Sequence, residues 1–234
     1  MKKFYKILVI LILILIIEIA IILMEYYSIN NKEAPNFNSK SNVIILIDTT
    51  SNYLSLYHDE QLYKTYQIAS GKPSTPSPTG TWKVVSKDTW GEGFGGHWMG
   101  LNVPWGKYGI HGTRLPNSIG WNSSKGCIRM RNNDIAEVYK LTPYGSTVII
   151  WSGDYGNFGG YLRILKPGAI GADVYQLQMI LKNKGYYKGT PNGIYGEYFK
   201  DVVHNFQKKN GLLVSDTIRS EEHTSELQSL AYLV

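Results

Sequence analysis

The sequence has a single cysteine, Cys127, among 234 residues. A disulfide within the chain is therefore impossible, and the small folds that depend on disulfides are excluded. The five histidines and the carboxylates show none of the spacings that bind metal ions, so we expect no metal site and no cofactor. A lone cysteine is usually a small buried residue, and only neighbours that stabilise its thiolate make it a nucleophile.

Clusters of basic residues are also scarce. The formal net charge is +6, but lysine and arginine are scattered beyond the first six residues. This distribution weighs against a nucleic-acid-binding protein, whereas an anionic lipid or an acidic wall polymer remains a compatible partner. With 43% hydrophobic residues, the chain can form one large or two small domains.

The N-terminus has the pattern of a targeting segment. Three lysines within the first six residues precede an apolar run, residues 7–24, which only Glu18 interrupts. The run is about the shortest that spans a bilayer as a helix, and no A-x-A-like cleavage site follows it. We expect residues 1–25 to be an uncleaved signal-anchor that leaves the rest of the chain outside the cell membrane, facing the wall. A cleaved signal peptide is the alternative.

Hydrophobic periodicity divides the rest of the chain into two domains. After a polar linker at residues 26–42, alternating apolar residues predict a mainly β domain over residues 43–151 with one helix near residues 134–141. Asn132 or Asn133 is expected to cap that helix. A glycine-rich linker follows at residues 152–161. Helical periodicity then predicts an all-α module over residues 162–218, so the fold class is α+β overall.

The helices of the module have recognisable ends. Asp173 is expected to cap the first helix, and Gly185 and Gly211 stand where helix C-caps belong. The stretch 219–229 resembles the translation of a common sequencing-adapter oligonucleotide. We therefore expect residues 219–234 to be foreign and to carry no function. The alternative is a genuine polar tail.

The residues around Cys127 suit a nucleophile. Gly126 allows a tight, open turn, so that the N–H groups of Gly126 and Cys127 can point at a bound carbonyl oxygen. A cysteine nucleophile also needs a base or a cation that holds it as a thiolate. His111, at the end of a predicted strand, is the base within reach. No carboxylate lies nearby in sequence. A backbone carbonyl, for example that of Gly112, is therefore expected to orient the imidazole.

These residues resemble the YkuD-type L,D-transpeptidases, whose signature runs H-G-[ST] and then S-[HK]-G-C-[IV]-R-[ML]. The chain has HGT at residues 111–113 and SKGCIRM at 124–130. The SGK at residues 70–72 and the PTGT at 78–81 are also similar to that family. The resemblance covers residues 43–151 and implies a β-sandwich-like fold with the cysteine in a cleft. Lys125 replaces the more common histidine, which leaves His111 as the single candidate base.

In this family the cysteine attacks the bond between the third and fourth residues of a peptidoglycan stem tetrapeptide. The acyl-enzyme then passes to the side-chain amine of another stem and forms a 3→3 crosslink. The resemblance implies Cys127 as nucleophile, His111 as acid and base, and Gly112 as the orienting carbonyl. Arg129 is expected either to hold a substrate carboxylate or to brace the loop. Ser124 and His97 are further candidates for substrate contact.

The second domain resembles the three-helix peptidoglycan-binding module, on segments such as NGIYG at residues 192–196 and FQ at 206–207. The expected partners are therefore peptidoglycan stem peptides and glycan, the membrane through residues 7–24, and no nucleic acid. Two alternatives to the transpeptidase stay open. One is an L,D-carboxypeptidase that resolves the same acyl-enzyme with water, and the other is a non-catalytic wall-binding anchor. His58 and His204 are interpreted as ordinary surface residues.

Overall fold

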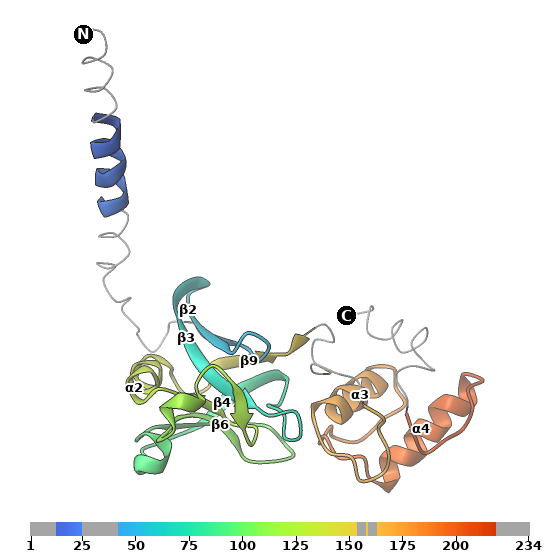
Figure 1. Ribbon diagram of the computed structural model, residues 1–234. Coiled ribbons are helices and arrows are strands. Elements are labelled where there is room, and N and C mark those ends of the chain that lie inside the picture. Colours follow the sequence, from blue (N-terminus) through green and yellow to red (C-terminus); the bar gives the residue numbers. More distant parts are fainter. Residues whose placement is uncertain (1–12, 25–41, 154–157, 159–162, 219–234) are drawn as a thin grey trace. The chain divides into compact units, whose positions relative to one another are not determined.

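The computed structural model describes residues 13–24, 42–153, 158 and 163–218. The chain divides into two compact units, residues 1–38 and residues 39–234. In the first unit, residues 13–24 form a helix (the blue helix of Figure 1), and its isoleucine and leucine side chains are exposed. None of the helices within the described residues is both long and apolar enough to cross a membrane. The expected transmembrane helix is therefore not supported, and much of the segment lies outside the described residues.

In the second unit, residues 43–151 form the expected mainly β domain, shown in Figure 1. Its strands are β1 (Val43–Asp48), β2 (Tyr53–His58), β3 (Gln61–Gly71), β4 (Gly80–Asp88), β5 (Trp98–Leu101), β6 (Tyr108–Gly112), β7 (Asn122–Ser124), β8 (Ile128–Met130) and β9 (Thr147–Trp151). They are ordered β2-β1-β9-β4-β5-β6-β8-β3-β7, and β2 also pairs with β3. This additional pairing closes the sheet on itself.

The closed sheet corrects the sandwich-like prediction to a barrel-like domain. Two strands, β3 and β4, are long enough to pair with different neighbours along their length. Residues 61–67 of β3 pair with β2, whereas Ile68 and Ala69 pair with β8. Residues 80–83 of β4 pair with β9, and residues 84–88 pair with β5, with a register shift between Val84 and Ser86. Because these strands continue from one part of the sheet into the other, the domain has no two separate sheets.

The interior of the barrel is filled by the apolar residues that alternate along the strands. In β1 the side chains of Val43, Ile45 and Ile47 are buried, while the residues between them are partly exposed. Leu54 and Leu56 of the adjacent β2 are fully buried as well. Each such side chain contributes about 1.5–3 kcal/mol when it leaves water. This shared interior fixes the register on which the site depends.

Helix α2 (Asn132–Leu141) packs on the barrel through Ile135 and Val138, which are fully buried. Its N-cap is Arg131, without a side-chain capping bond, so the expected Asn132 or Asn133 cap is wrong. The Asn132 side chain is used elsewhere, because its Oδ1 accepts a hydrogen bond from the Thr113 N–H at 2.9 Å. Two short 3-10 helices, η1 (Glu92–Phe94) and η2 (Pro116–Ser118), lie in the loops that flank β5 and β6.

The C-terminal module has the two expected helices, α3 (Ala172–Asn183) and α4 (Glu197–Lys209). They enclose a core of their own, with ten buried residues: Leu165, Val174, Leu177, Leu181, Tyr187, Tyr195, Phe199, Val202, Val203 and Ile218. Gly185 and Gly211, with φ of 81° and 71°, follow the C-caps as predicted. The N-cap of α3 is Gly171 instead of Asp173. The closing helix that the family would place after Ile218 falls outside the described residues.

Candidate active site

Two neighbouring parallel strands place His111 and Cys127 near each other. Strand β6 pairs with β8 so that His111 lies opposite Arg129, and Cys127 immediately precedes β8. Both side chains line a cavity of about 490 Å³. The other residues that line it are Gly93, Phe94, Thr113, Arg114, Leu115, Ser124, Lys125 and Arg129. The two residues predicted to carry the chemistry therefore face one cavity, although they stand 16 positions apart in the sequence.

The imidazole of His111 is held in a defined orientation. Its Nδ1 lies 2.6 Å from the carbonyl oxygen of Gly112, so a backbone carbonyl is its partner, as the sequence predicts. A carbonyl only accepts hydrogen bonds, so Nδ1 carries the proton and Nε2 keeps its lone pair. Phe94 packs edge-on against the ring, with 4.9 Å between ring centroids, and Trp98 stacks on it at 5.6 Å. The aromatic packing limits rotation of the ring.

Burial keeps this imidazole neutral. The pKa of His111 is lowered chiefly because burial disfavours the charged form, and the nearby Arg129 charge lowers it further. The hydrogen bond to Gly112 acts in the opposite direction but does not cancel these effects. At neutral pH the imidazole is therefore uncharged, and its Nε2 is available to accept a proton.

The surroundings of Cys127 favour the protonated thiol over the thiolate. Burial raises the pKa of its thiol, against smaller lowering effects of the Gly109 backbone N–H, Arg129 and Lys107. The Sγ lies 3.9 Å from the carbonyl oxygen of Lys107, and within the described part of the chain no hydrogen bond joins it to His111. Hydrogen bonds between catalytic groups are often long before a substrate binds, so this geometry does not argue against His111 as the base.

The turn before Cys127 is built differently from the prediction. Gly126 has a φ of 114°, and a Cβ at this position would lie 2.7 Å from Tyr108 Cε1, so glycine is required. Its N–H donates to Ser124 Oγ at 3.0 Å, and that hydroxyl donates to the Cys127 carbonyl oxygen at 2.6 Å. The Gly126 N–H is therefore not free for an oxyanion. Ser124, 1% exposed, braces the turn with the hydroxyl that was expected to contact substrate.

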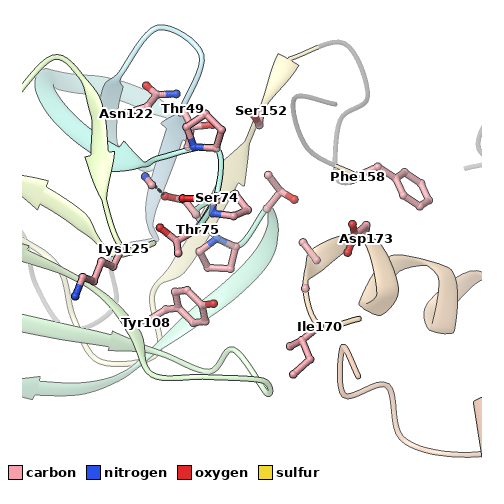
Figure 2. A pocket seen from close by; sticks show the side chains of 18 of the residues that line it. Thr49, Ser74, Thr75, Tyr108, Asn122, Lys125, Ser152, Phe158, Ile170 and Asp173 are labelled. Atoms are coloured by element: carbon pink, nitrogen blue, oxygen red, sulfur yellow. Dashed lines mark hydrogen bonds between the residues drawn. The ribbon is translucent and has the colours of Figure 1, made fainter. Parts of the chain in front are cut away.

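The loop between β3 and β4, residues 72–79, also supports this turn. The Ser124 carbonyl oxygen accepts a hydrogen bond from the Lys72 N–H at 3.1 Å and from the Thr75 hydroxyl at 3.3 Å. Figure 2 shows Ser74 and Thr75 beside Lys125 and Tyr108, around a second cavity that Lys125 also lines. The SGK segment at residues 70–72 thus leads into a loop that supports the cysteine turn.

Of the two remaining candidates for substrate contact, one lines the cavity and the other does not. Arg129 lines the cavity. His97 lies outside the cavity lining and packs on Tyr139 with 4.8 Å between ring centroids, so it is not among the residues that form the cleft. Sequence reasoning missed Arg114, although it directly follows the HGT segment, and Trp98, whose position opposite His111 depends on the β5–β6 register.

Comparison with known proteins finds two family matches along the chain. Residues 42–150 match the family model of the L,D-transpeptidase catalytic domain, YkuD, and residues 170–215 match that of the "Putative peptidoglycan binding domain". The chain therefore contains a YkuD L,D-transpeptidase catalytic domain followed by a peptidoglycan-binding domain. Their order agrees with that predicted from the sequence.

Individual relatives cover the first of these domains. The chain is similar to the "Putative L,D-transpeptidase YkuD" of Bacillus licheniformis, at 41% identity over 107 residues, and to that of Bacillus subtilis, at 40% over 107 residues. Each match spans 45% of this chain and 64% of the relative. A solved L,D-transpeptidase from Mycobacterium smegmatis is similar at 22% identity with a TM-score of 0.42, over 48% of this chain and 59% of that one.

Proposed function

We propose that this protein is a cysteine L,D-transpeptidase that forms 3→3 crosslinks between peptidoglycan stem peptides. The observation that carries the proposal is that Cys127 and the imidazole of His111, whose Nε2 is unprotonated, line one cavity. The match of residues 42–150 to the YkuD catalytic domain supports the substrate class. The match of residues 170–215 supports attachment to the same polymer.

The reaction begins with transfer of the Cys127 proton to His111 Nε2 as the sulfur attacks the carbonyl carbon of the third stem residue. The C–N bond to the fourth residue then breaks, and the imidazolium returns the proton to the leaving amine. This leaves the third residue as a thioester on Cys127. The side-chain amine of an acceptor stem gives a proton to Nε2, attacks the thioester and regenerates the thiol. Each proton passes through one nitrogen, whose orientation depends on the Gly112 carbonyl.

We further propose that residues 7–24 hold the protein in the cell membrane, with the catalytic domain outside. The support is the sequence pattern of three early lysines followed by an apolar run. Protease added to intact cells should digest the catalytic domain. Full protection of that domain would contradict this orientation and would separate the protein from its substrate.

The direct test is incubation of the purified full chain with a disaccharide-tetrapeptide, followed by mass analysis. A crosslinked dimer that has lost one terminal residue is the expected product. A tripeptide without a dimer would favour the carboxypeptidase alternative. The matched control is Cys127→Ser, which should give neither product while keeping the melting temperature of the wild type. Absence of both products with the folded wild-type protein would contradict the proposal.

A further inference from the structure

Three positively charged side chains converge on the cavity that contains Cys127. Arg114, Lys125 and Arg129 all line it, and none of the other described side chains in its lining is acidic. Each cation comes from a different segment. Arg114 follows β6, Lys125 belongs to the turn before the cysteine, and Arg129 is on β8. The guanidinium of Arg114 lies near Gly93, because its Nη2 is 3.9 Å from where a Gly93 Cβ would stand.

Some of the protein's other basic side chains form ion pairs. Lys64 pairs with Glu137, and Arg163 pairs with Asp173. Within the described residues, the structure records no ion pair and no side-chain hydrogen bond for Arg114, Lys125 or Arg129. Three like charges around one cavity repel each other, so a bound anion would lower the free energy of the site. The cavity is open to solvent at Arg114 and Lys125, which are exposed, so these charges remain hydrated until a ligand arrives.

The chemistry of these groups indicates a carboxylate ligand. A guanidinium presents a planar fork of N–H donors that matches the two oxygens of a carboxylate, and a carboxamide offers only one acceptor oxygen. An ammonium such as that of Lys125 attracts a carboxylate as a point charge but has little attraction for a neutral amide. The arrangement therefore distinguishes the ionised from the amidated form of the same peptide.

We propose that Arg114 and Lys125, together with Arg129, make this cavity select stem peptides with free carboxyl groups over the same peptides with carboxamides. Arg114 and Lys125 are specificity-determining residues in this scheme. The proposal rests on the proposed function, because it takes the cavity to be the stem-peptide cleft. It adds to that function a preference for ionised side-chain carboxyl groups. The transpeptidase reaction itself does not require these groups to be ionised.

The test measures binding apart from turnover. The full chain carrying Cys127→Ala is titrated calorimetrically with two synthetic stem tetrapeptides, which are identical except that the side-chain carboxyl groups of one are carboxamides. We expect the carboxylate form to bind about tenfold more tightly, and salt should reduce this preference. Arg114→Gln and Lys125→Gln, each added to this protein, should reduce the preference roughly threefold. Lys140→Gln removes the same charge from an exposed position on α2 and should change nothing.

Equal affinity for the two peptides, or no measurable binding of the carboxylate form, would overturn the inference. So would a preference that survives in both glutamine variants. Turnover by the wild-type chain separates this result from the proposed function. If both peptides are crosslinked but bind equally, the transpeptidase stands and the selectivity does not. If the carboxylate peptide binds preferentially but yields no product, the selectivity stands and the proposed reaction does not.

Discussion

The Nδ1 of His111 lies 2.6 Å from the carbonyl oxygen of Gly112, the next residue in the chain. A neutral carbonyl fixes the tautomer, but it stabilises an imidazolium less than a carboxylate does. The pKa of His111 is accordingly lowered and that of Cys127 raised, so the resting pair is neutral. Thiolate formation is therefore coupled to substrate attack rather than completed beforehand.

This neutral resting state predicts slow alkylation of the thiol. The pKa of Cys127 lies above its ordinary 9.0, because partial burial of the side chain disfavours the thiolate. At pH 7 less than about 1% of the protein should be thiolate, and the rate of reaction with iodoacetamide should keep rising beyond pH 9. As the chain has one cysteine, mass analysis of the labelled protein follows this site alone. A rate that levels off below pH 7 would indicate a preformed thiolate and would contradict the prediction.

The charge of Arg129 predicts that its removal shifts the acidic side of the pH profile of kcat/KM. Arg129 lies opposite His111 and lowers the pKa of the imidazole and of the thiol. The base must be unprotonated, so in the wild type kcat/KM should fall only as the pH drops below 6.5, the ordinary pKa of histidine. In Arg129→Gln the pKa of His111 rises, and the fall should begin at a higher pH. Arg131→Gln, with the same charge change at an exposed position, should leave the profile unchanged. An unshifted acidic side of the profile in Arg129→Gln would be inconsistent with this electrostatic coupling.

Asn132 is predicted to hold the HGT segment in position. Its Oδ1 accepts the Thr113 N–H at 2.9 Å, and a Cβ on Gly112 would lie 2.7 Å from the same oxygen. In Asn132→Ala this bond is lost, so the free energy of unfolding should fall by about 1 kcal/mol and kcat should fall with it. Asn132→Asp keeps the acceptor oxygen at the first turn of α2, and we expect near wild-type values for both. The measurements are urea denaturation and crosslinking rate. Equal behaviour of the alanine and aspartate variants would exclude this role.

Much of this arrangement could be predicted from the sequence because its signals are local. The alternation of apolar residues indicated the β domain, and the HGT and SKGCIRM segments indicated where His111 and Cys127 would be found. The absence of a nearby carboxylate also led to the Gly112 carbonyl as the partner of His111. These inferences depended on residues close together in the chain.

The features that were missed depend on long-range pairing. Closure of the barrel requires β2 to pair with β3 while β3 also pairs with β8, and no local pattern specifies both. Trp98 reaches His111 through the β5–β6 register. Ser124 is a candidate for substrate contact in the sequence, but its hydroxyl donates a hydrogen bond to the Cys127 carbonyl oxygen. Asn132 is a candidate helix cap, but its Oδ1 accepts a hydrogen bond from the Thr113 N–H.

The last residues that the structure describes contribute to the core of the module. Leu165 and Ile218 exchange two backbone hydrogen bonds, of 3.0 and 2.8 Å, and the Tyr195 hydroxyl donates to the Asp216 carbonyl oxygen at 2.9 Å. Ile218 is 8% exposed and belongs to the core of the module. Removal of residues 213–234 should therefore lower the free energy of unfolding of the module by about 2 kcal/mol or more, since a buried isoleucine and its bridge are lost.

Removal of residues 219–234 alone is the matched control, because it keeps Ile218 and every contact just described. If the adapter-like stretch is foreign, this shorter truncation should leave both the melting temperature of the module and its binding to purified peptidoglycan at wild-type values. Differential scanning calorimetry and a sedimentation assay measure the two quantities. Weaker peptidoglycan binding after removal of residues 219–234 would assign a function to that stretch and would contradict its interpretation as foreign sequence.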